Sequence, residues 1–371
     1  MTVTTFSFPT TIRFGVGTLA ELPELLSALH GAKPFLVTDR GLVGTETFAV
    51  VQRVLRERAV VFSSVRANPV DGDVDSAAEA FTDAGCDSVV AVGGGSALDV
   101  GKAVRLRIRR PDRTLHEFDP HLDWSGLAPF VAIPTTAGTG SEVSRSAVIM
   151  LEGRKSRIFH QALLADLVLL DPTLTRELPP KLTAATGADA LAHCIEAFTS
   201  PALQPMCDGI ALEGVRLIAQ ALPAAVKDGG NLEARGAMQI AATMGGIALQ
   251  KEVGLAHALA HPLSSICGLH HGLADALCLP HVMEFNAERQ PGLYRRVGIA
   301  LGLSRADDRA TIKRVRALLS KVGLRGGLRS HGVSESHLHK LTEQAVEDGS
   351  HRANPLPVTA EDLRSLYERA L

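Results

Sequence analysis

The stretch from Ser88 to Arg109, SVVAVGGGSALDVGKAVRLRIR, joins an apolar run to a glycine triplet and then to a segment with helical spacing. The β-branched run Ser88–Val92 predicts a buried strand, and Ala97–Arg109 predicts a helix. Between them, Gly93-Gly94-Gly95-Ser96 lets the backbone approach a ligand closely, and Ser96 is placed to cap the helix. The stretch therefore predicts a strand–turn–helix unit with an anion site at the start of the helix.

The same alternation of strands and helices continues through the first half of the chain. Further apolar runs predict strands at Phe35–Thr38, Val60–Val65, Phe130–Pro134 and Leu167–Leu170. Segments with helical spacing lie between these runs, at Leu19–Leu29, Thr45–Arg58 and Val74–Ala84. Such alternation is typical of a parallel sheet with helices on both faces.

The second half of the chain changes to helices, with no clear strand after about Pro179. Helices are predicted at Leu182–Phe198, Asp208–Leu222, Leu232–Ile247, Gly254–Leu263, Ala274–Glu288, Arg309–Val322, Glu335–Val346 and Ala360–Ala370. Pro179-Pro180 marks the boundary. We therefore expect an α/β domain over residues 1–178 and an all-α domain over residues 179–371.

Composition limits the classes of partner. The 371 residues carry a net charge of -2, 46% are hydrophobic and 21% are charged. This balance indicates neither a nucleic-acid partner nor an anionic membrane. Met1–Thr11 lacks the pattern of a signal peptide, and no window is expected to span a bilayer. Five scattered cysteines without a CxxC pair suit a reducing compartment, so a cytoplasmic protein is expected.

Two further features point to a nucleotide. The loop Thr135–Glu142, TTAGTGSE, follows a predicted strand and is rich in hydroxyl groups and glycine. Such a loop suits phosphate and ribose hydroxyls, although the same residues also favour ordinary turns. Asp39 follows the strand Phe35–Thr38, where a carboxylate can bind a ribose diol and repel a 2′-phosphate. If Asp39 faces the adenosine ribose, it favours NAD over NADP.

A set of histidines in the helical half suggests a metal ion. Asp189 and His193 are four residues apart on one predicted helix, and His257 and His261 repeat this spacing on another. His270-His271 follows within ten residues. One carboxylate with several imidazoles suits Fe²⁺ or Zn²⁺. With 14 histidines in the chain, spacing alone does not decide which of them are ligands.

Several of these segments resemble the iron-dependent (group III) alcohol dehydrogenase family. They are Gly93–Asp99, Thr135–Glu142, Gly187–His193 with Glu196-Ala197, Gly254–Pro262, His271-Gly272 and Leu279–Val282, in the family's order and spacing. The resemblance implies a dinucleotide-binding α/β domain and a helical metal-binding domain with a cleft between them, an architecture like that of dehydroquinate synthase. The stretch Ile108–Ser125 fits the family poorly; a variable loop near the cofactor edge and a solvated excursion are both open, and we favour the solvated excursion.

The resemblance also implies roles for particular residues. It gives Asp189, His193, His257 and His271 as metal ligands and His261 as a catalytic histidine near the nicotinamide. The cofactor-binding residues that it implies are Asp39, Gly94, Gly95, Ser96, Asp99, Thr135, Thr136, Thr139 and Lys155. It implies one divalent ion, Fe²⁺ ahead of Zn²⁺, and a homodimer or larger homo-oligomer.

The chemistry expected from this resemblance is hydride transfer between NAD(H) and a small alcohol, aldehyde or ketone. A maleylacetate reductase is the second hypothesis; that branch often has Asn at the position of Asp189. A lyase like dehydroquinate synthase is a remote third, because its ligand set begins with Glu. A substrate that carries an acid group is also open, with Arg145, Arg154 or Arg157 as its partner. A binding protein without activity is the hypothesis from another class.

Overall fold

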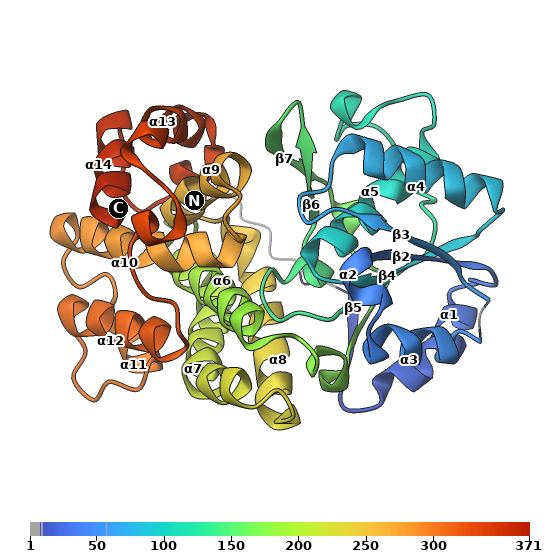
Figure 1. Cartoon of the computed structure of the whole chain (residues 1–371), viewed down its shortest axis with the longest axis horizontal. Helices are drawn as coiled ribbons and strands as arrows, with labels where there is room; N and C mark the ends of the chain where they lie inside the picture. Colours follow the sequence, from blue (N-terminus) through green and yellow to red (C-terminus); the bar gives the residue numbers. More distant parts are fainter. Residues whose placement is uncertain (1–7, 9, 57) are drawn as a thin grey trace. The chain divides into compact units, whose positions relative to one another are not determined.

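The computed structural model describes residue 8, residues 10–56 and residues 58–371. Its internal contacts divide the chain into two compact units, each described here by itself. The α/β unit comprises Phe8–Thr136 and Ser141–Leu178, and the helical unit comprises Ala137–Gly140 and Pro179–Leu371. In Figure 1 the α/β unit is coloured blue to green and the helical unit green to red. The four residues Ala137–Gly140 thus group with the helices, although they precede residue 179 in sequence.

A six-stranded parallel sheet forms the centre of the α/β unit, in the order β1-β8-β5-β4-β2-β3. Its strands are β1 (Thr11–Phe14), β2 (Pro34–Asp39), β3 (Val60–Val65), β4 (Ser88–Gly93), β5 (Phe130–Pro134) and β8 (Leu167–Leu170). The fold class expected from the sequence is confirmed. Strand β1 and the antiparallel hairpin β6 (Ser146–Leu151) and β7 (Arg154–Phe159) were not expected from the sequence.

Helices cover both faces of this sheet. They are α1 (Leu22–Ala28), α2 (Arg40–Val43), α3 (Glu46–Val54), α4 (Asp71–Asp83) and α5 (Gly95–Arg109). Figure 1 shows α1 and α3 on one face and α4 and α5 on the other. Side chains alternate between these layers: Leu36 of β2 packs in the cluster with α1 and α3, whereas its neighbour Phe35 contacts Phe81 of α4 edge-on. The alternation buries both faces, as a parallel sheet requires.

The order of the strands places β2 next to β4, where the direction of the connections reverses. In open α/β sheets, ligands bind beyond the carboxyl ends of the strands at such a switch point. Strand β2 ends at Asp39, and β4 ends at Gly93. Asp39 and the glycine turn, two of the three sequence features that indicate a nucleotide, therefore lie at the position where such sheets bind ligands.

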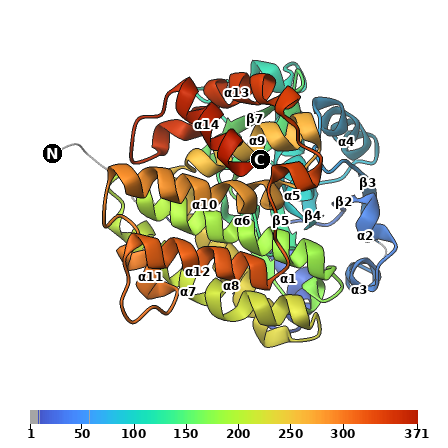
Figure 2. The same ribbon diagram turned by 60° about the vertical axis from the view of Figure 1, so that its left-hand side comes forward.

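The helical unit is built from the second half of the chain. Its helices are α6 (Pro180–Thr199), α7 (Pro205–Lys227), α8 (Leu232–Ala248), α9 (Leu255–Cys267), α10 (His271–Arg289), α11 (Arg295–Ala300), α12 (Asp308–Lys321), α13 (Leu338–Glu347) and α14 (Ala360–Ala370). Figures 1 and 2 show α6 and α10 side by side. Most of α6 is buried, because small residues such as Ala184 and Ala188 let neighbouring helices approach closely. This close packing positions the site described below.

One helix is longer and more apolar than was expected from the sequence. α7 is long and apolar enough to cross a bilayer by length and composition, although the sequence was expected to contain no such window. One such helix is weak evidence for a membrane span, because core helices pass the same test. α7 packs against α6 and α8 and supplies Ala211, Val215 and Ile218 to the hydrophobic core.

The stretch Ile108–Ser125, expected to be a solvated excursion, is held by internal contacts. The Arg107 guanidinium donates to the backbone carbonyls of Arg110, Pro111 and Arg113. Trp124 is buried, stacks on Phe118 and donates its indole N–H to a backbone carbonyl. The segment is therefore an ordered loop packed around one tryptophan.

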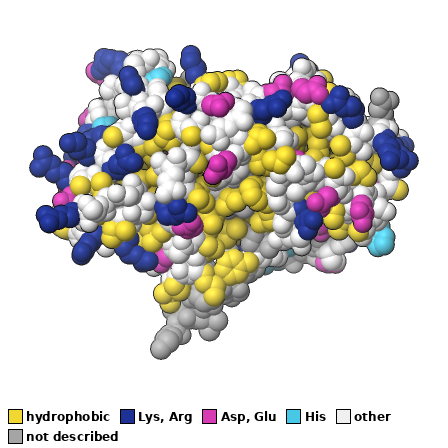
Figure 3. All heavy atoms as spheres, turned by 90° about the horizontal axis from the view of Figure 1, so that it is seen from below, with side chains coloured by type: hydrophobic (Ala, Val, Ile, Leu, Met, Phe, Trp, Pro, Cys, Tyr) yellow, Lys and Arg dark blue, Asp and Glu magenta, His cyan; other side chains and the backbone are white. Residues whose placement is uncertain are grey.

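Charged side chains of both signs lie on the face that Figure 3 shows, mostly around apolar side chains that gather across its middle. This mixture follows from nearly equal totals, 38 basic and 40 acidic residues.

Candidate metal centre and cofactor site

Three helices of the helical unit bring the expected metal ligands together. Asp189 and His193 lie one turn apart on α6, His257 lies in the first turn of α9, and His271 begins α10. The i, i+4 spacing on α6 places the first two on one face. Asp189, His193 and His257 are buried, and the His271 side chain is 23% exposed. The structure thus brings together four residues that span more than eighty positions of sequence.

The three imidazoles surround one carboxylate oxygen. Oδ1 of Asp189 lies 3.5 Å from Nε2 of His193, 3.6 Å from Nε2 of His257 and 4.0 Å from Nε2 of His271. A tetrahedral ion with bonds of about 2.1 Å has ligands about 3.4 Å apart. The observed spacing is therefore close to that of a coordination sphere.

Two buried polar atoms face one another in this cluster, Nε2 of His257 and Oδ1 of Asp189, which lie 3.6 Å apart. Nδ1 of His257 lies 2.5 Å from Oε2 of Glu196, so in the neutral ring Nδ1 carries the proton and Nε2 holds the lone pair. Among the described residues, neither that Nε2 nor Oδ1 of Asp189 has a hydrogen-bond partner, and both atoms are buried. Burial lowers the pKa of His193 to about 4, so this imidazole is neutral at pH 7 and can donate a lone pair. The residues therefore fit a bound divalent ion.

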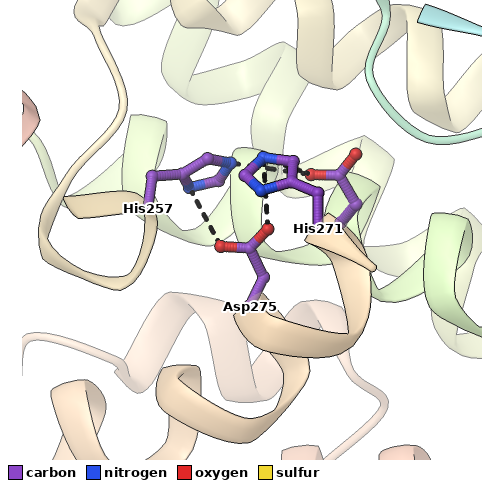
Figure 4. Close-up of side chains that lie close together, drawn as sticks. His257, His271 and Asp275 are labelled. Atoms are coloured by element: carbon purple, nitrogen blue, oxygen red, sulfur yellow. Dashed lines mark ion pairs between the residues drawn. The ribbon is translucent and has the colours of Figure 1, made fainter. Parts of the chain in front are cut away.

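Sequence reasoning gave no role to two carboxylates beside the ligands, Glu196 and Asp275. Asp275 is fully buried, with Oδ2 3.5 Å from Nε2 of His271 and Oδ1 3.7 Å from Nδ1 of His257. Figure 4 shows its carboxylate between the two imidazoles. Spacing could have indicated both, since Glu196 follows His193 by three residues and Asp275 follows His271 by four.

His261 lies beside the cluster and is held by another carboxylate. Its ring stacks on that of His271 with centroids 5.2 Å apart, and its Nδ1 lies 2.6 Å from Oδ2 of Asp348. Asp348 precedes a short 3-10 helix and also accepts the backbone N–H of Ser350. The side chain of His261 is 20% exposed. This partial exposure beside the cluster suits a group that exchanges protons.

A glycine allows α10 to approach α6 at the cluster. A Cβ on Gly272 would lie 2.0 Å from the backbone oxygen of Ala185 and 3.0 Å from Cβ of Asp189. Both distances are shorter than normal contacts, so only glycine fits between the helices. The residue after His271 thus determines how closely this ligand approaches Asp189.

The expected cofactor residues at the ends of β2 and β4 lie together in the α/β unit. Gly93 has a φ of +151°, and a Cβ there would lie 2.8 Å from Cβ of Ala97 and 3.4 Å from Oδ2 of Asp39. Gly94 precedes α5 and Gly95 begins it, and none of the described side chains caps this helix. Ala97 donates its N–H to the carbonyl of Gly94, so the first-turn N–H groups that would bind an anion are those of Gly95 and Ser96. Asp39 accepts the N–H of Leu42 and caps α2.

Ser96 and the threonines of the second loop have different surroundings. Ser96 does not cap α5 as expected; it lies inside the helix and donates to the backbone oxygen of Ala67 at 2.7 Å. Thr135 is buried and donates its N–H to the carbonyl of Gly93, and Thr136 lies beside Gly94. The loop after β5 therefore adjoins the glycine turn.

Asp99 is buried rather than open to a ligand. Its carboxylate accepts hydrogen bonds from Oγ of Ser141 at 2.5 Å and from N of Val148 at 3.0 Å. The fully buried Lys102 lies 3.6 Å from it and donates to the carbonyls of Ser141 and Ser146. Burial raises the pKa of Asp99 and lowers that of Lys102. The pair holds residues 141–148 against α5, so Asp99 positions this loop through hydrogen bonds.

Thr139 and Lys155 belong to parts of the chain other than the glycine turn after β4. Thr139 belongs to the helical unit, where neighbouring Gly140 has a φ of +63° and fits against Gly246 of α8. Lys155 lies on β7, paired with Met150 of β6. Their role in cofactor binding stays a prediction.

The family assignment follows from comparison with known proteins. Residues 9–172 match the family described as iron-containing alcohol dehydrogenase. Residues 183–371 match the C-terminal domain of the Fe-containing alcohol dehydrogenase family.

Individual relatives agree with this match over nearly the whole chain. A 4-hydroxybutyrate dehydrogenase of Cupriavidus necator is 37% identical, with 98% of each chain covered. A solved 1,3-propanediol oxidoreductase has a TM-score of 0.95 at 32% identity and covers 99% of this chain and 100% of its own. A sulfoacetaldehyde reductase from Bifidobacterium kashiwanohense, solved with NAD⁺, has a TM-score of 0.90 at 30% identity, covering 100% and 99%. The chain belongs to the iron-containing alcohol dehydrogenase family, whose members are oxidoreductases that act on alcohols.

Proposed function

We propose that this protein transfers hydride between NAD(H) and a small alcohol, aldehyde or ketone, with one divalent ion held by Asp189, His193, His257 and His271. The observation that carries the proposal is the ring of three imidazole nitrogens around one buried carboxylate oxygen. We put Fe²⁺ first because the family is described as iron-containing, and Zn²⁺ also suits these donors. When bound, such an ion supplies Lewis acidity toward the substrate oxygen.

The residues of the α/β unit would hold the cofactor. The open first turn of α5, beside Gly94 and Gly95, suits the pyrophosphate. Asp39 adjoins this turn and would accept hydrogen bonds from a ribose diol, which favours NAD over NADP. Thr135 and Thr136 would line the same place. Ser96, Asp99 and Lys155 complete the expected set in this unit, with Asp99 acting through Ser141, and Thr139 is its expected member in the helical unit.

His261 would move the proton of the alcohol. Asp348 holds its Nδ1, and Nε2 would accept a proton when the alcohol is oxidised and return it in reduction. The other chain residues supply position and exclude water. The substrate loses one hydride and one proton, so the alcohol becomes a carbonyl compound.

The proposal also covers the location, the assembly and the domain organisation of the enzyme. We expect a cytoplasmic protein with a small-molecule substrate, assembled as a homodimer or larger homo-oligomer and organised as two domains over residues 1–178 and 179–371. The comparisons give no support to maleylacetate reductase or to a dehydroquinate-synthase-like lyase. The substrates named for the relatives include 4-hydroxybutyrate and 1,3-propanediol, and both belong in a first panel.

The test is a turnover assay that follows the absorbance of reduced nicotinamide. Chelator-treated protein, the same protein with Fe²⁺ or Zn²⁺ restored, and Asp189→Asn are each offered small alcohols, aldehydes, ketones and maleylacetate. We expect turnover of an alcohol–carbonyl pair that needs the ion and is lost in Asp189→Asn. Maleylacetate reduction that survives chelation and Asp189→Asn would overturn the proposal.

A further inference from the structure

Glu196 is a buried carboxylate at the junction of α6 and α9. It lies on α6 three residues after His193 and is 5% exposed. Oε2 lies 2.5 Å from Nδ1 of His257 and accepts the N–H of Gly254 at 3.1 Å, while Oε1 accepts the N–H of Ala256 at 2.5 Å. One side chain of α6 thus binds both the first turn of α9 and the metal-binding histidine on it.

We propose that Glu196 is the positioning residue of the metal centre, which fixes the tautomer and ring orientation of His257. This inference rests on the proposed metal site. Because Glu196 accepts the Nδ1 proton, Nε2 is the lone-pair atom of His257, and it faces Oδ1 of Asp189. A carboxylate behind a ligating imidazole also makes that imidazole a stronger donor. Without Glu196 the ring could rotate or place its proton on Nε2, where a metal ion cannot bind.

The same carboxylate fixes the distance between ligands on different helices. Asp189 and Glu196 lie seven residues apart on α6, so their positions relative to each other are set by one rigid helix. The two backbone hydrogen bonds then tie the start of α9 to that helix. His257 follows directly, so its distance from Asp189 depends on Glu196.

Gly254 makes room for this arrangement. A Cβ on Gly254 would lie 3.0 Å from Oε1 of Glu196 and 3.2 Å from its Cδ. The φ of Gly254 is -111°, outside the left-handed region that favours glycine. Replacement by alanine therefore displaces the carboxylate by a few tenths of an ångström and leaves its charge in place.

The test measures metal binding directly. Chelator-stripped wild type, Glu196→Gln, Gly254→Ala and the control Glu343→Gln, which changes a 64% exposed carboxylate on α13, are titrated with Zn²⁺ against a chromophoric chelator. Parallel titration with Co²⁺ records the ligand-field absorption spectrum. We expect Glu196→Gln to raise the Kd for Zn²⁺ by about 10–100-fold and to change the Co²⁺ spectrum. Gly254→Ala should show a smaller shift in the same direction, and Glu343→Gln should match the wild type.

The outcomes separate this inference from the proposed function. If the wild type binds Zn²⁺ tightly and Glu196→Gln has the same Kd and Co²⁺ spectrum, the inference is overturned and the metal centre stands. A wild type that binds neither ion would overturn the metal centre itself, and the inference with it. If Glu196→Gln loses thermal stability in chelator but keeps the wild-type Kd, Glu196 is only a helix cap and the inference is wrong. If Glu196→Gln does not fold, Gly254→Ala decides, and an unchanged Kd there overturns the inference.

Discussion

Nδ1 of His261 lies 2.6 Å from Oδ2 of Asp348, eighty-seven residues further along the chain. Burial opposes ionisation of this carboxyl group, but hydrogen bonds from His261 and Ser350 outweigh it and lower the pKa of Asp348 to about 2, from 3.8. A carboxyl group whose pKa is lower in the folded than in the unfolded protein stabilises the folded state at pH values above the unfolded pKa. That contribution is lost as the pH falls through the folded pKa.

We therefore expect Asp348→Asn to lower the free energy of unfolding by about 1–2 kcal/mol at pH 7. The difference from wild type should stay constant down to about pH 5 and shrink between about pH 4 and pH 2. Urea unfolding at a series of pH values measures it. A difference that does not change between pH 5 and pH 3 would contradict the assigned pKa.

Gly272→Ala should damage the metal site through packing alone. The added Cβ would overlap the Ala185 carbonyl, so α10 must move away from α6 and carry His271 with it. We expect loss of at least tenfold in metal affinity and destabilisation of about 1–3 kcal/mol. Gly209→Ala on α7, where a Cβ meets nothing within 4 Å, is the matched control. The control should be neutral or slightly more stable, because alanine favours the helix.

Metal removal should lower stability in wild type but not in a ligand variant. An ion present at about 1,000 times its Kd stabilises the native state by about 4 kcal/mol. We expect Zn²⁺ to raise the melting temperature of chelator-stripped wild type and to leave that of His193→Ala unchanged. Equal shifts in both proteins would show that the ion binds elsewhere.

Lys102→Met should destabilise the protein because it leaves a buried carboxylate and two serine carbonyls without their cation. The expected loss is about 3–5 kcal/mol in urea unfolding. Adding Asp99→Leu to Lys102→Met should recover part of that loss, since the double variant no longer buries an uncompensated charge. Additive losses in the double variant would mean that the two side chains are not coupled.

Asp39→Ala should change the choice of cofactor. Removing the carboxylate next to Gly93 removes repulsion of a 2′-phosphate and the acceptor for a ribose diol. We expect the ratio of affinity for NADH to that for NADPH to fall by at least tenfold, as measured by titration calorimetry. Asp71→Ala, an exposed carboxylate at the start of α4, serves as control. An unchanged ratio in Asp39→Ala would place the adenosine ribose elsewhere.

Most elements of the fold and the types of side chain at the site follow from the sequence alone. Apolar runs such as Val89–Val92 predict buried strands because a parallel sheet is covered on both faces, and the spacing of Asp189 and His193 follows from the helical repeat. The short strand β1 and the hairpin β6–β7 escaped prediction. β1 is only four residues long, and the hairpin carries charged residues such as Arg154 and Arg157 where an apolar run would be expected.

The tertiary structure decided which groups meet. Spacing could not decide which histidines are ligands. The structure places Nε2 of His193, His257 and His271 around Asp189, whereas His261 pairs with Asp348. Nothing in the sequence indicated that Asp99, an expected cofactor-binding residue, lies 3.6 Å from the buried Lys102. The physical reason is that local patterns depend on neighbours within a few residues, while a metal site and a buried ion pair depend on contacts between helices and strands distant in sequence. Those contacts are set by packing, down to the single glycine that lets α10 reach α6.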